Sequence, residues 1–356
     1  MLTFTVKSFV VASKGVRLRT LATAAAASGG KAFTIPVIDF SKFKQAQSAV
    51  EKQETAAEIV TAFKESGFVY LSGHGIPRER VPKGMASKGF FALPTEIKDS
   101  LAWEDPRANR GYVQIGRERV TQSSDPDEIA ALREKAPDYK ETMEIGRDWD
   151  SEWKNQWPKE SDAPLFKQTM LDFFQTCHNL HVDVMRSVAI GLDLGERFFD
   201  DKVNEQCHNL RLLSYPPIKS SLLVKDGQAR AGAHSDYGTL TLLFQDSVGG
   251  LEVQNPHTKS FIPAIPVPDT IVVNIGDLLS RWSNDVLRST LHRVVAPAGK
   301  QVNDKEKVTP HRQSIAFFCN PNFSAEVACL PNCGPHAKYP PVNAGDYIVG
   351  RLAATY

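Results

Sequence analysis

The sequence lacks a strong net charge, abundant cysteine and a long apolar run, and each absence excludes a class of protein. Its 42 lysines and arginines and 41 acidic residues leave a net charge of +1, which gives no electrostatic case for binding nucleic acid or a membrane surface. No apolar run approaches the roughly 20 residues that span a bilayer. Five cysteines in 356 residues do not indicate a disulfide framework and favour a reducing compartment. With 42% hydrophobic and 23% charged residues, the chain is expected to be globular with a sizeable core.

Acidic residues are also missing from the first 38 residues, since the first acid is Asp39. That stretch is rich in Ala, Ser and Thr, which is typical of a mitochondrial transit peptide, and its apolar core is too short for a secretory signal. The alternative is a disordered tail or a misplaced start codon. We expect residues 1–33 to be a targeting-like or disordered extension, and the protein to be cytoplasmic or mitochondrial. The basic residues of this stretch are Lys7, Lys14, Arg17, Arg19 and Lys31.

Two groups of potential metal ligands lack partners. Cys329, Cys333 and His336 have no fourth ligand and lie in a proline-rich stretch, so we do not expect a zinc site there. His178 and His181 lie on a predicted helix. Helical histidines without a partner ligand are more often packing or surface residues, so these two receive no chemical role.

The first half of the chain is patterned mainly for helices. Residues 47–65 and 162–194 place apolar side chains at steps of three and four, which predicts two amphipathic helices. Residues 77–101 predict a helix in two pieces, and short strands are expected at 37–40 and 66–76.

Residues 103–160 are polar and irregular, and loops of this length are usually functional or disordered. We expect them to supply walls of a substrate pocket. Trp149, Trp153 and Trp157 lie four apart; they could form an aromatic lid, but we favour a locally packed loop. The basic residues that could meet an acidic substrate, and that we interpret as solvated surface charge, are Arg117, Arg119 and Arg230.

After Cys207 the pattern changes to short strands separated by turn signals, as in a sandwich or jelly roll. The late strands need a cover for one face and the early helices supply apolar faces, so we expect one compact α+β unit. The strand-like segments are NLRLLSYPP, AHSDYGTLTLLFQD, GLEVQN, SFIPAIP, TIVVNIG, LHRVV, QSIAFFCN and AEVACLP.

Polar residues interrupt two of these apolar segments. His234 and Asp236 stand two apart in HSDYGTLTLL, so on one strand they would share a face, and His292 follows in LHRVV. Two imidazoles and one carboxylate can occupy one face of an octahedral metal and leave three positions open, as in non-haem Fe(II) oxygenases. Zinc accepts the same ligands, but no nearby glutamate offers the base of zinc hydrolysis. The pattern therefore favours iron.

Arg312 and Ser314, again two apart, lie on the segment RQSIAFF. An arginine fork binds a carboxylate bidentately, and a serine hydroxyl adds a third hydrogen bond. A dicarboxylate that chelates iron through a keto-acid end would need such a clamp for its far end, and 2-oxoglutarate is the obvious candidate. Tyr215, on NLRLLSYPP, can add a phenol hydroxyl.

Long motifs accompany these residues. IPVIDF and FVYLSGHGIP stand near the start, and NRGYVQIGRERV and DYKETMEIG in the middle. HSDYGTLTLLFQD, VVNIGDLLSRWSNDVLRSTLHRVV, RQSIAFFCNPN and GDYIVGRLAATY follow. Together they resemble the 2-oxoglutarate- and Fe(II)-dependent oxygenases of the isopenicillin N synthase-like family, over most of residues 34–356.

The resemblance implies an α+β fold with a double-stranded β-helix (jelly roll) core flanked by helices from the N-terminal half. An N-terminal oxygenase region, 34–160, and a helix plus binding core, 161–356, would form one compact unit. It also implies Fe(II), 2-oxoglutarate as co-substrate, ascorbate as an optional reductant, O2 and a small-molecule substrate. No catalytic residue is expected beyond the metal centre. The residues carried over are His234, Asp236 and His292 for iron, and Arg312, Ser314 and Tyr215 for 2-oxoglutarate.

The implied reaction oxidises an unactivated C–H bond, by hydroxylation, desaturation or ring closure, and releases succinate and CO2. The alternatives are a same-fold oxidase that does not use 2-oxoglutarate, of the isopenicillin N synthase-like or ethylene-forming type, and a non-catalytic jelly-roll binding protein. Asp236 argues against the halogenase variant, which leaves that ligand position open. Leu213 replaces an Asn that can touch the co-substrate in relatives. Asn274, Gly276 and Asp277 match a family turn and are expected to be structural.

Overall fold

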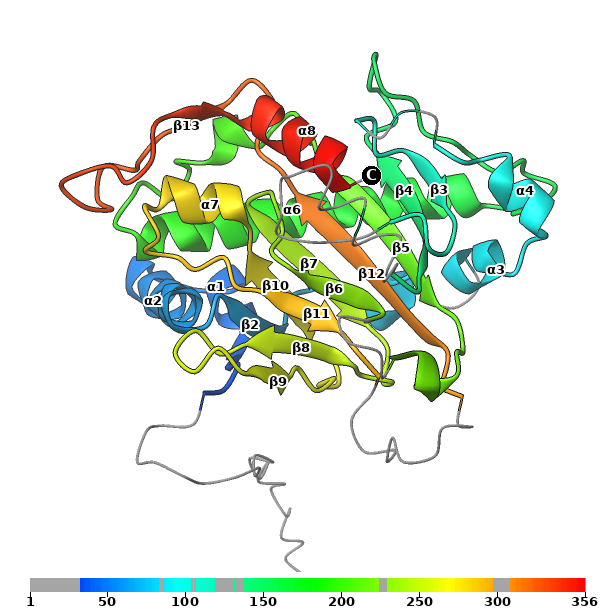
Figure 1. The fold of residues 1–356 in the computed structure, drawn as a ribbon. Coiled ribbons are helices and arrows are strands. Elements are labelled where there is room, and N and C mark those ends of the chain that lie inside the picture. The colour runs from blue at the N-terminus through cyan, green and yellow to red at the C-terminus, as the bar shows by residue number, and fades with distance from the viewer. Residues whose placement is uncertain are drawn as a thin grey trace, which may run out of the picture. The chain divides into compact units, whose positions relative to one another are not determined.

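A large, mostly antiparallel sheet forms the main wall of the fold (Figure 1). The computed structural model describes residues 33–82, 86–103, 105, 107–118, 131, 138–223, 229–296 and 308–355, within the compact unit Phe33–Tyr356. The strand order is β1-β2-β10-β7-β12-β5-β4-β3, and β1 and β2 pair in parallel. The strands are β1 (Val37–Asp39), β2 (Phe68–Ser72), β3 (Gly111–Val113), β4 (Glu141–Gly146), β5 (Asn209–Tyr215), β7 (Leu240–Gln245), β10 (Ile271–Ile275) and β12 (Arg312–Cys319).

A smaller sheet, in the order β6-β11-β8-β9, faces the large one. An apolar cluster joins the two, with Phe68, Leu213 and Val272 from the large sheet and Val253 and Val294 from the small one. Two facing antiparallel sheets with helices outside them confirm the predicted α+β fold with a jelly-roll core. The strands are β6 (Ala231–His234), β8 (Leu251–Gln254), β9 (Phe261–Pro263) and β11 (His292–Val294), and a separate pair is β13 (Glu326–Val327) and β14 (Val342–Asn343).

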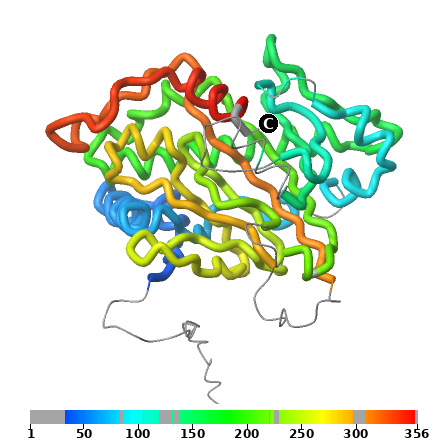
Figure 2. Tube along the Cα trace, in the orientation of Figure 1, coloured from blue at the N-terminus to red at the C-terminus, as the bar shows by residue number. Residues whose placement is uncertain are grey.

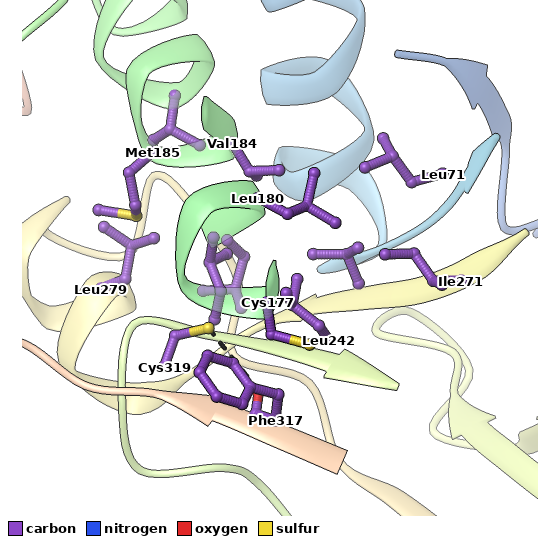
Figure 3. Packing of buried hydrophobic residues seen from close by; sticks show 14 of the residues in the cluster. Leu71, Cys177, Leu180, Val184, Met185, Leu242, Ile271, Leu279, Phe317 and Cys319 are labelled. Atoms are coloured by element: carbon purple, nitrogen blue, oxygen red, sulfur yellow. Dashed lines mark hydrogen bonds between the residues drawn. The ribbon is translucent and has the colours of Figure 1, made fainter. Parts of the chain in front are cut away.

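Helices cover the opposite face of the large sheet. Cys177, Leu180 and Val184 of α6 lie over Leu242 and Phe317 of the sheet in the main core (Figure 3). α2 packs against α6, and the hydroxyl of Ser48 caps its first turn by accepting from Glu51 N–H. The helices are α1 (Ser41–Lys44), α2 (Ala49–Glu65), α3 (Lys88–Phe91), α4 (Thr95–Asp99), α6 (Phe166–Gly191), α7 (Asp277–Trp282) and α8 (Ala344–Thr355).

The two long amphipathic helices are confirmed as α2 and α6 within four residues at each end. The helix predicted over 77–101 is shorter than expected. In the described part of that range the helical pieces are a 3-10 turn at Arg78–Arg80 and the short α3 and α4. Local pattern alone does not resolve one-turn pieces of this kind.

The interpretation of AHSDYGTLTLLFQD as one strand is wrong. His234 ends β6 in the small sheet, Asp236 lies in the following turn, and β7 begins at Leu240 in the large sheet. Gly238 is needed where the chain crosses between sheets, because a Cβ there would stand 2.2 Å from the carbonyl oxygen of Cys319. A Cβ at Gly276 would likewise stand 2.3 Å from the carbonyl oxygen of Gly238.

The predicted N-terminal extension, 1–33, lies outside the described residues except for Phe33. In the part of the chain that the structure describes, no helix is both long and apolar enough to cross a membrane.

Candidate metal centre and co-substrate pocket

The structure brings the three predicted iron ligands together between the two sheets. His234 and His292 are paired across β6 and β11, and Asp236 follows in the turn after β6. The Nε2 atoms of His234 and His292 lie 3.9 Å and 3.7 Å from Asp236 Oδ1. One ligand atom from each residue lies within 4.8 Å of the other two, which is the spacing that a shared metal ion requires.

Backbone carbonyls orient the two imidazoles. His234 Nδ1 lies 2.7 Å from the Gly232 carbonyl oxygen, and His292 Nδ1 lies 3.3 Å from that of Thr290. Since a carbonyl only accepts, each Nδ1 carries the proton and each Nε2 presents its lone pair. This is how metal-bound histidines are usually held.

Two hydrogen bonds fix the carboxylate. Asp236 Oδ2 accepts from Thr241 Oγ1 at 2.5 Å and from Asn274 Nδ2 at 2.8 Å, which leaves Oδ1 toward the imidazoles. Asn274 was expected to be only structural; it also orients a predicted ligand. The sequence signal was a lone amide on the apolar run TIVVNI.

The charge states suit a divalent cation. Burial, and then repulsion by His292, lowers the pKa of His234, so it is neutral at neutral pH. Burial acts to raise the pKa of Asp236, but attraction to His292 and His234 outweighs it, and the carboxyl stays ionised. Two imidazoles and one carboxylate form the donor set of a facial Fe(II) site, so the residues present fit iron.

A cavity of about 580 Å³ adjoins this centre, and all the predicted 2-oxoglutarate residues line it. Arg312 and Tyr215 face each other across β12 and β5, and the guanidinium carbon lies 4.7 Å from the centre of the tyrosine ring. Arg312 is buried and donates to Ser314 Oγ at 3.2 Å, and its Nε has no partner among the described residues. A buried guanidinium with an unused N–H beside a hydroxyl fits a carboxylate.

Two further residues mark this cavity. Leu213, where relatives often have Asn, lines it as an apolar wall opposite Ser314. Lys140 lines it too, although sequence reasoning gave it no role, and it is neutralised by Asp138 at 2.9 Å and Glu118 at 3.1 Å. Its only sequence signal was its place in the family motif DYKETMEIG.

A second cavity, of about 790 Å³, reaches the same centre and is the candidate substrate site. It shares His234, Asp236, Arg211 and Phe318 with the first. The C-terminal segment, red in Figure 2, supplies part of its wall through α8. Its other lining residues include Asn109, Arg110, Glu118, Trp153, Cys207, His208, Asn209, Asn320, Phe323, Ile348 and Leu352.

Arg211 lies between the two cavities in a buried ionic network. It binds Glu118 Oε1 at 3.1 Å and Glu144 Oε1 at 2.6 Å, and the other Glu118 oxygen binds Lys140. A buried carboxylate between two cations holds both in place. No sequence signal pointed to this network.

The three tryptophans and three arginines singled out in the sequence do not gather at shared sites in the structure. Trp153 lines the substrate cavity, Trp157 packs on Phe166 in the main core, and Trp149 is exposed. Arg117 stacks on Trp103, and Arg119 lies outside the described residues. The interpretation of Arg230 as surface charge is wrong, because its side chain is fully buried.

A second histidine cluster, His178, His181 and His208, also brings ligand atoms within 4.8 Å. His208 Nδ1 accepts from Asn320 N–H at 3.0 Å, so its proton is on Nε2, which donates to His178 Nδ1 at 3.0 Å. His208 therefore has no lone pair for a metal, and the cluster is a hydrogen-bonded packing group. Among the described residues, the ligand atoms of Cys329, Cys333 and His336 do not gather within 4.8 Å of one another.

Comparisons with known proteins agree with this chemistry. A family model described as the 2OG-Fe(II) oxygenase superfamily matches residues 206–321. Another, described as the N-terminal part of non-haem dioxygenases in morphine synthesis, matches residues 35–160. The 2-oxoglutarate-dependent dioxygenase htyE of Aspergillus rugulosus is 37% identical, over 90% of this chain and 99% of that protein. Proline hydroxylase buaE of Petromyces alliaceus is 33% identical, over 90% and 98%.

Among solved structures, a full-length Neurospora crassa protein in complex with alpha-KG is 47% identical, with a TM-score of 0.81, over 90% of this chain and 96% of that one. The same protein with alpha-KG and thymine is 46% identical, with a TM-score of 0.81, over 90% and 97%. The matching family models, relatives and folds agree with the two-histidine, one-carboxylate group: this chain belongs to the 2OG-Fe(II) oxygenase superfamily and is a 2-oxoglutarate-dependent Fe(II) dioxygenase acting on a small molecule.

Proposed function

We propose that this dioxygenase oxidises the exocyclic methyl group of a pyrimidine base, thymine in the first instance. The observation that carries the proposal is a pair of buried hydrogen-bond acceptors in the substrate cavity. Asn109 Oδ1 and Asn209 Oδ1 have no partner among the described residues. Each unsatisfied buried acceptor costs about 1–3 kcal/mol, so the two favour a ligand with N–H donors.

A pyrimidine base offers the matching chemistry. Its two ring N–H groups can satisfy the amide oxygens, and its carbonyl oxygens can accept from Arg110, whose buried Nε also lacks a partner in the described chain. Phe318 and Trp153 line the cavity, and aromatic faces favour a flat ring. The solved relatives support the same class, because the Neurospora crassa protein was crystallised with thymine and with 5-formyluracil. These two bases differ only in the oxidation state of one exocyclic carbon.

An amino-acid substrate fits the cavity less well, although one relative is a proline hydroxylase. An ammonium group would need an ionised carboxylate. Glu118, a carboxylate of the cavity, is already bound by Lys140 and Arg211, and Asp236 belongs to the metal centre. A neutral heterocycle avoids this mismatch.

In the proposed mechanism His234, Asp236 and His292 hold Fe(II). Arg312 and Ser314 bind the distal carboxylate of 2-oxoglutarate, and Tyr215 assists them. When bound there, Fe(II) would supply the chemistry that links oxidative decarboxylation of 2-oxoglutarate by O2, giving succinate and CO2, to oxidation of the substrate C–H bond. The protein orients the methyl group toward the centre from the second cavity. Phe318, Ile348 and Leu352 exclude water around it.

The test is substrate-dependent succinate release by the full-length enzyme with Fe(II), 2-oxoglutarate and ascorbate. Thymine should stimulate release and gain one oxygen atom by mass spectrometry, whereas uracil, which lacks the methyl group, should give no oxygenated product. Stimulation by L-proline but not thymine would refute the substrate assignment. Thymine oxidation that persists without 2-oxoglutarate would favour a same-fold oxidase.

Variants connect the assay to the site. His234→Ala should abolish succinate release in a protein that still folds. Asn209→Ala should raise the KM for thymine about tenfold, because it removes an acceptor worth about 1–2 kcal/mol. The matched control Asn179→Ala changes an exposed amide on α6 and should leave this KM unchanged.

A further inference from the structure

Arg230 is a buried cation that forms no ion pair with any described residue, and the carboxylate of Asp246 acts on its charge only from a longer distance. It lies just before β6, and its side chain is fully buried. Its Nε and Nη1 have no hydrogen-bond partner among the described residues, and no described carboxylate forms an ion pair with it. An unpaired buried charge is costly, so its retention calls for a compensating anion.

The hydrogen bonds that Arg230 does make lead to the co-substrate clamp. Its Nη2 donates to Thr309 Oγ1 at 2.5 Å and to the carbonyl oxygens of Pro216 at 3.2 Å and Pro310 at 3.1 Å. Pro216 follows Tyr215 directly, and Pro310 stands two residues before Arg312. Arg230 therefore holds the backbone beside both clamp residues.

The same tyrosine ring brings two guanidinium groups near each other. The guanidinium carbon of Arg312 lies 4.7 Å from the centre of the Tyr215 ring, and that of Arg230 lies 5.9 Å from it. Burial, and then repulsion by Arg312, lowers the pKa of Arg230 to about 10, so the group stays charged at neutral pH. Two other cations lie beside this cavity, and both are already neutralised. Lys140 pairs with Asp138 and Glu118, and Arg211 pairs with Glu118 and Glu144.

The charges thus leave an excess of positive potential where the far end of the co-substrate would lie. The single distal carboxylate of the co-substrate neutralises the charge of Arg312, and Arg230 adds a second positive charge. Arg230 does not line the cavity, so it acts through Tyr215, Arg312 and the field across them.

We propose that Arg230 is a positioning residue that makes the co-substrate pocket selective for 2-oxo acids with a second carboxylate. Its charge strengthens the attraction for the distal carboxylate, and its hydrogen bonds hold the strand ends that carry Tyr215 and Arg312. The inference goes beyond the pyrimidine proposal, because it holds for any substrate.

The experiment measures binding of two acids to full-length protein loaded with Fe(II) under anaerobic conditions, by titration calorimetry. The probes are 2-oxoglutarate and 2-oxopentanoate, which has the same length but no distal carboxylate. Arg230→Gln should weaken 2-oxoglutarate binding about tenfold, equivalent to about 1.4 kcal/mol, and change 2-oxopentanoate binding less than twofold. Arg230→Lys keeps the charge and should retain the dicarboxylate preference within threefold.

The matched control is Arg197→Gln, which removes a charge from a side chain that is 79% exposed and should alter neither affinity. A purely structural role predicts that Arg230→Gln weakens both acids equally, and that result would overturn the proposal. Unchanged 2-oxoglutarate binding in a folded Arg230→Gln protein would overturn it too. If Arg230→Gln does not fold, loss of the dicarboxylate preference in folded Arg230→Lys refutes the charge role. No pyrimidine is present, so the outcome is independent of the substrate assignment.

Discussion

Replacing Asn274 with Ala should weaken metal binding although Asn274 is not itself a predicted metal ligand. Asn274 lies on β10, and its Nδ2 donates to Asp236 Oδ2 at 2.8 Å. The variant leaves that oxygen with Thr241 as its remaining hydrogen-bond donor. Asp236 can then rotate, and its other oxygen is no longer held toward His234 and His292.

The size of the effect follows from this geometry. A lost partner of a ligand residue typically lowers metal affinity 10–100-fold, which corresponds to about 1.4–2.7 kcal/mol. Because Thr241 still holds Asp236 Oδ2, we expect the lower part of that range, about tenfold. The variant should also lose about 1–3 kcal/mol of unfolding free energy, since it removes a buried hydrogen bond.

Anaerobic titration of the metal-free protein with Fe(II) or Co(II) measures the affinity directly. Asn322→Ala is the matched control, because Asn322 is an equally buried amide that binds Asp201, Asn204 and Glu205 instead of a metal ligand. The control should be destabilised but keep its metal affinity. If Asn274→Ala binds metal within twofold of the unaltered protein, the orienting role of Asn274 is wrong.

Three further predictions concern other parts of the chain. Ile348→Ala should raise the KM for thymine severalfold and leave the KM for 2-oxoglutarate unchanged in steady-state assays, because Ile348 lines only the substrate cavity. Burial lowers the pKa of His181 to about 3, so the folded state resists its protonation. The free energy of unfolding should therefore fall by about 1.4 kcal/mol per pH unit as the pH drops from about 6.5 toward 3, and His181→Gln should flatten that slope in urea unfolding. A fluorescent fusion of residues 1–35 should enter mitochondria if the acid-free start is a transit peptide, and a cytosolic signal would refute that role.

The placement of the six predicted site residues around one cavity could be inferred from the sequence because strand pairing brings them together. His234 and His292 are opposite each other in one ladder, and Arg312 and Tyr215 in another. Polar side chains on apolar strands are costly unless they have partners, so they are conspicuous in the sequence. The sequence interpretation was wrong in placing Asp236 on the same strand as His234. Asp236 lies in a turn between the two sheets, and a local sequence pattern does not show where the chain passes from one sheet to the other.

The 103–160 segment supplies part of the substrate cavity as expected, but the cavity's buried ionic network and the burial of Arg230 were not predictable in this way. Arg211 meets Glu118 across 93 positions of the chain, and Arg230 meets Thr309 across 79. A charged residue looks the same in the sequence whether it is solvated or buried against a distant partner. Arginine side chains are more often exposed than buried, and for this reason Arg230 was wrongly interpreted as surface charge.

The two cavities differ in how they are built, and this bears on how such an enzyme changes substrate. The co-substrate cavity is lined mainly by paired strands of both sheets, so its clamp residues are held by ladder hydrogen bonds. The substrate cavity also takes walls from the 107–118 segment, which contains the edge strand β3, and from the C-terminal helix α8. A substitution at Ile348 or Trp153 can therefore reshape the wall of the proposed substrate cavity while leaving the proposed metal ligands and carboxylate clamp in place. Arg211 and Phe318 line both cavities, so changes there should alter substrate and 2-oxoglutarate binding together.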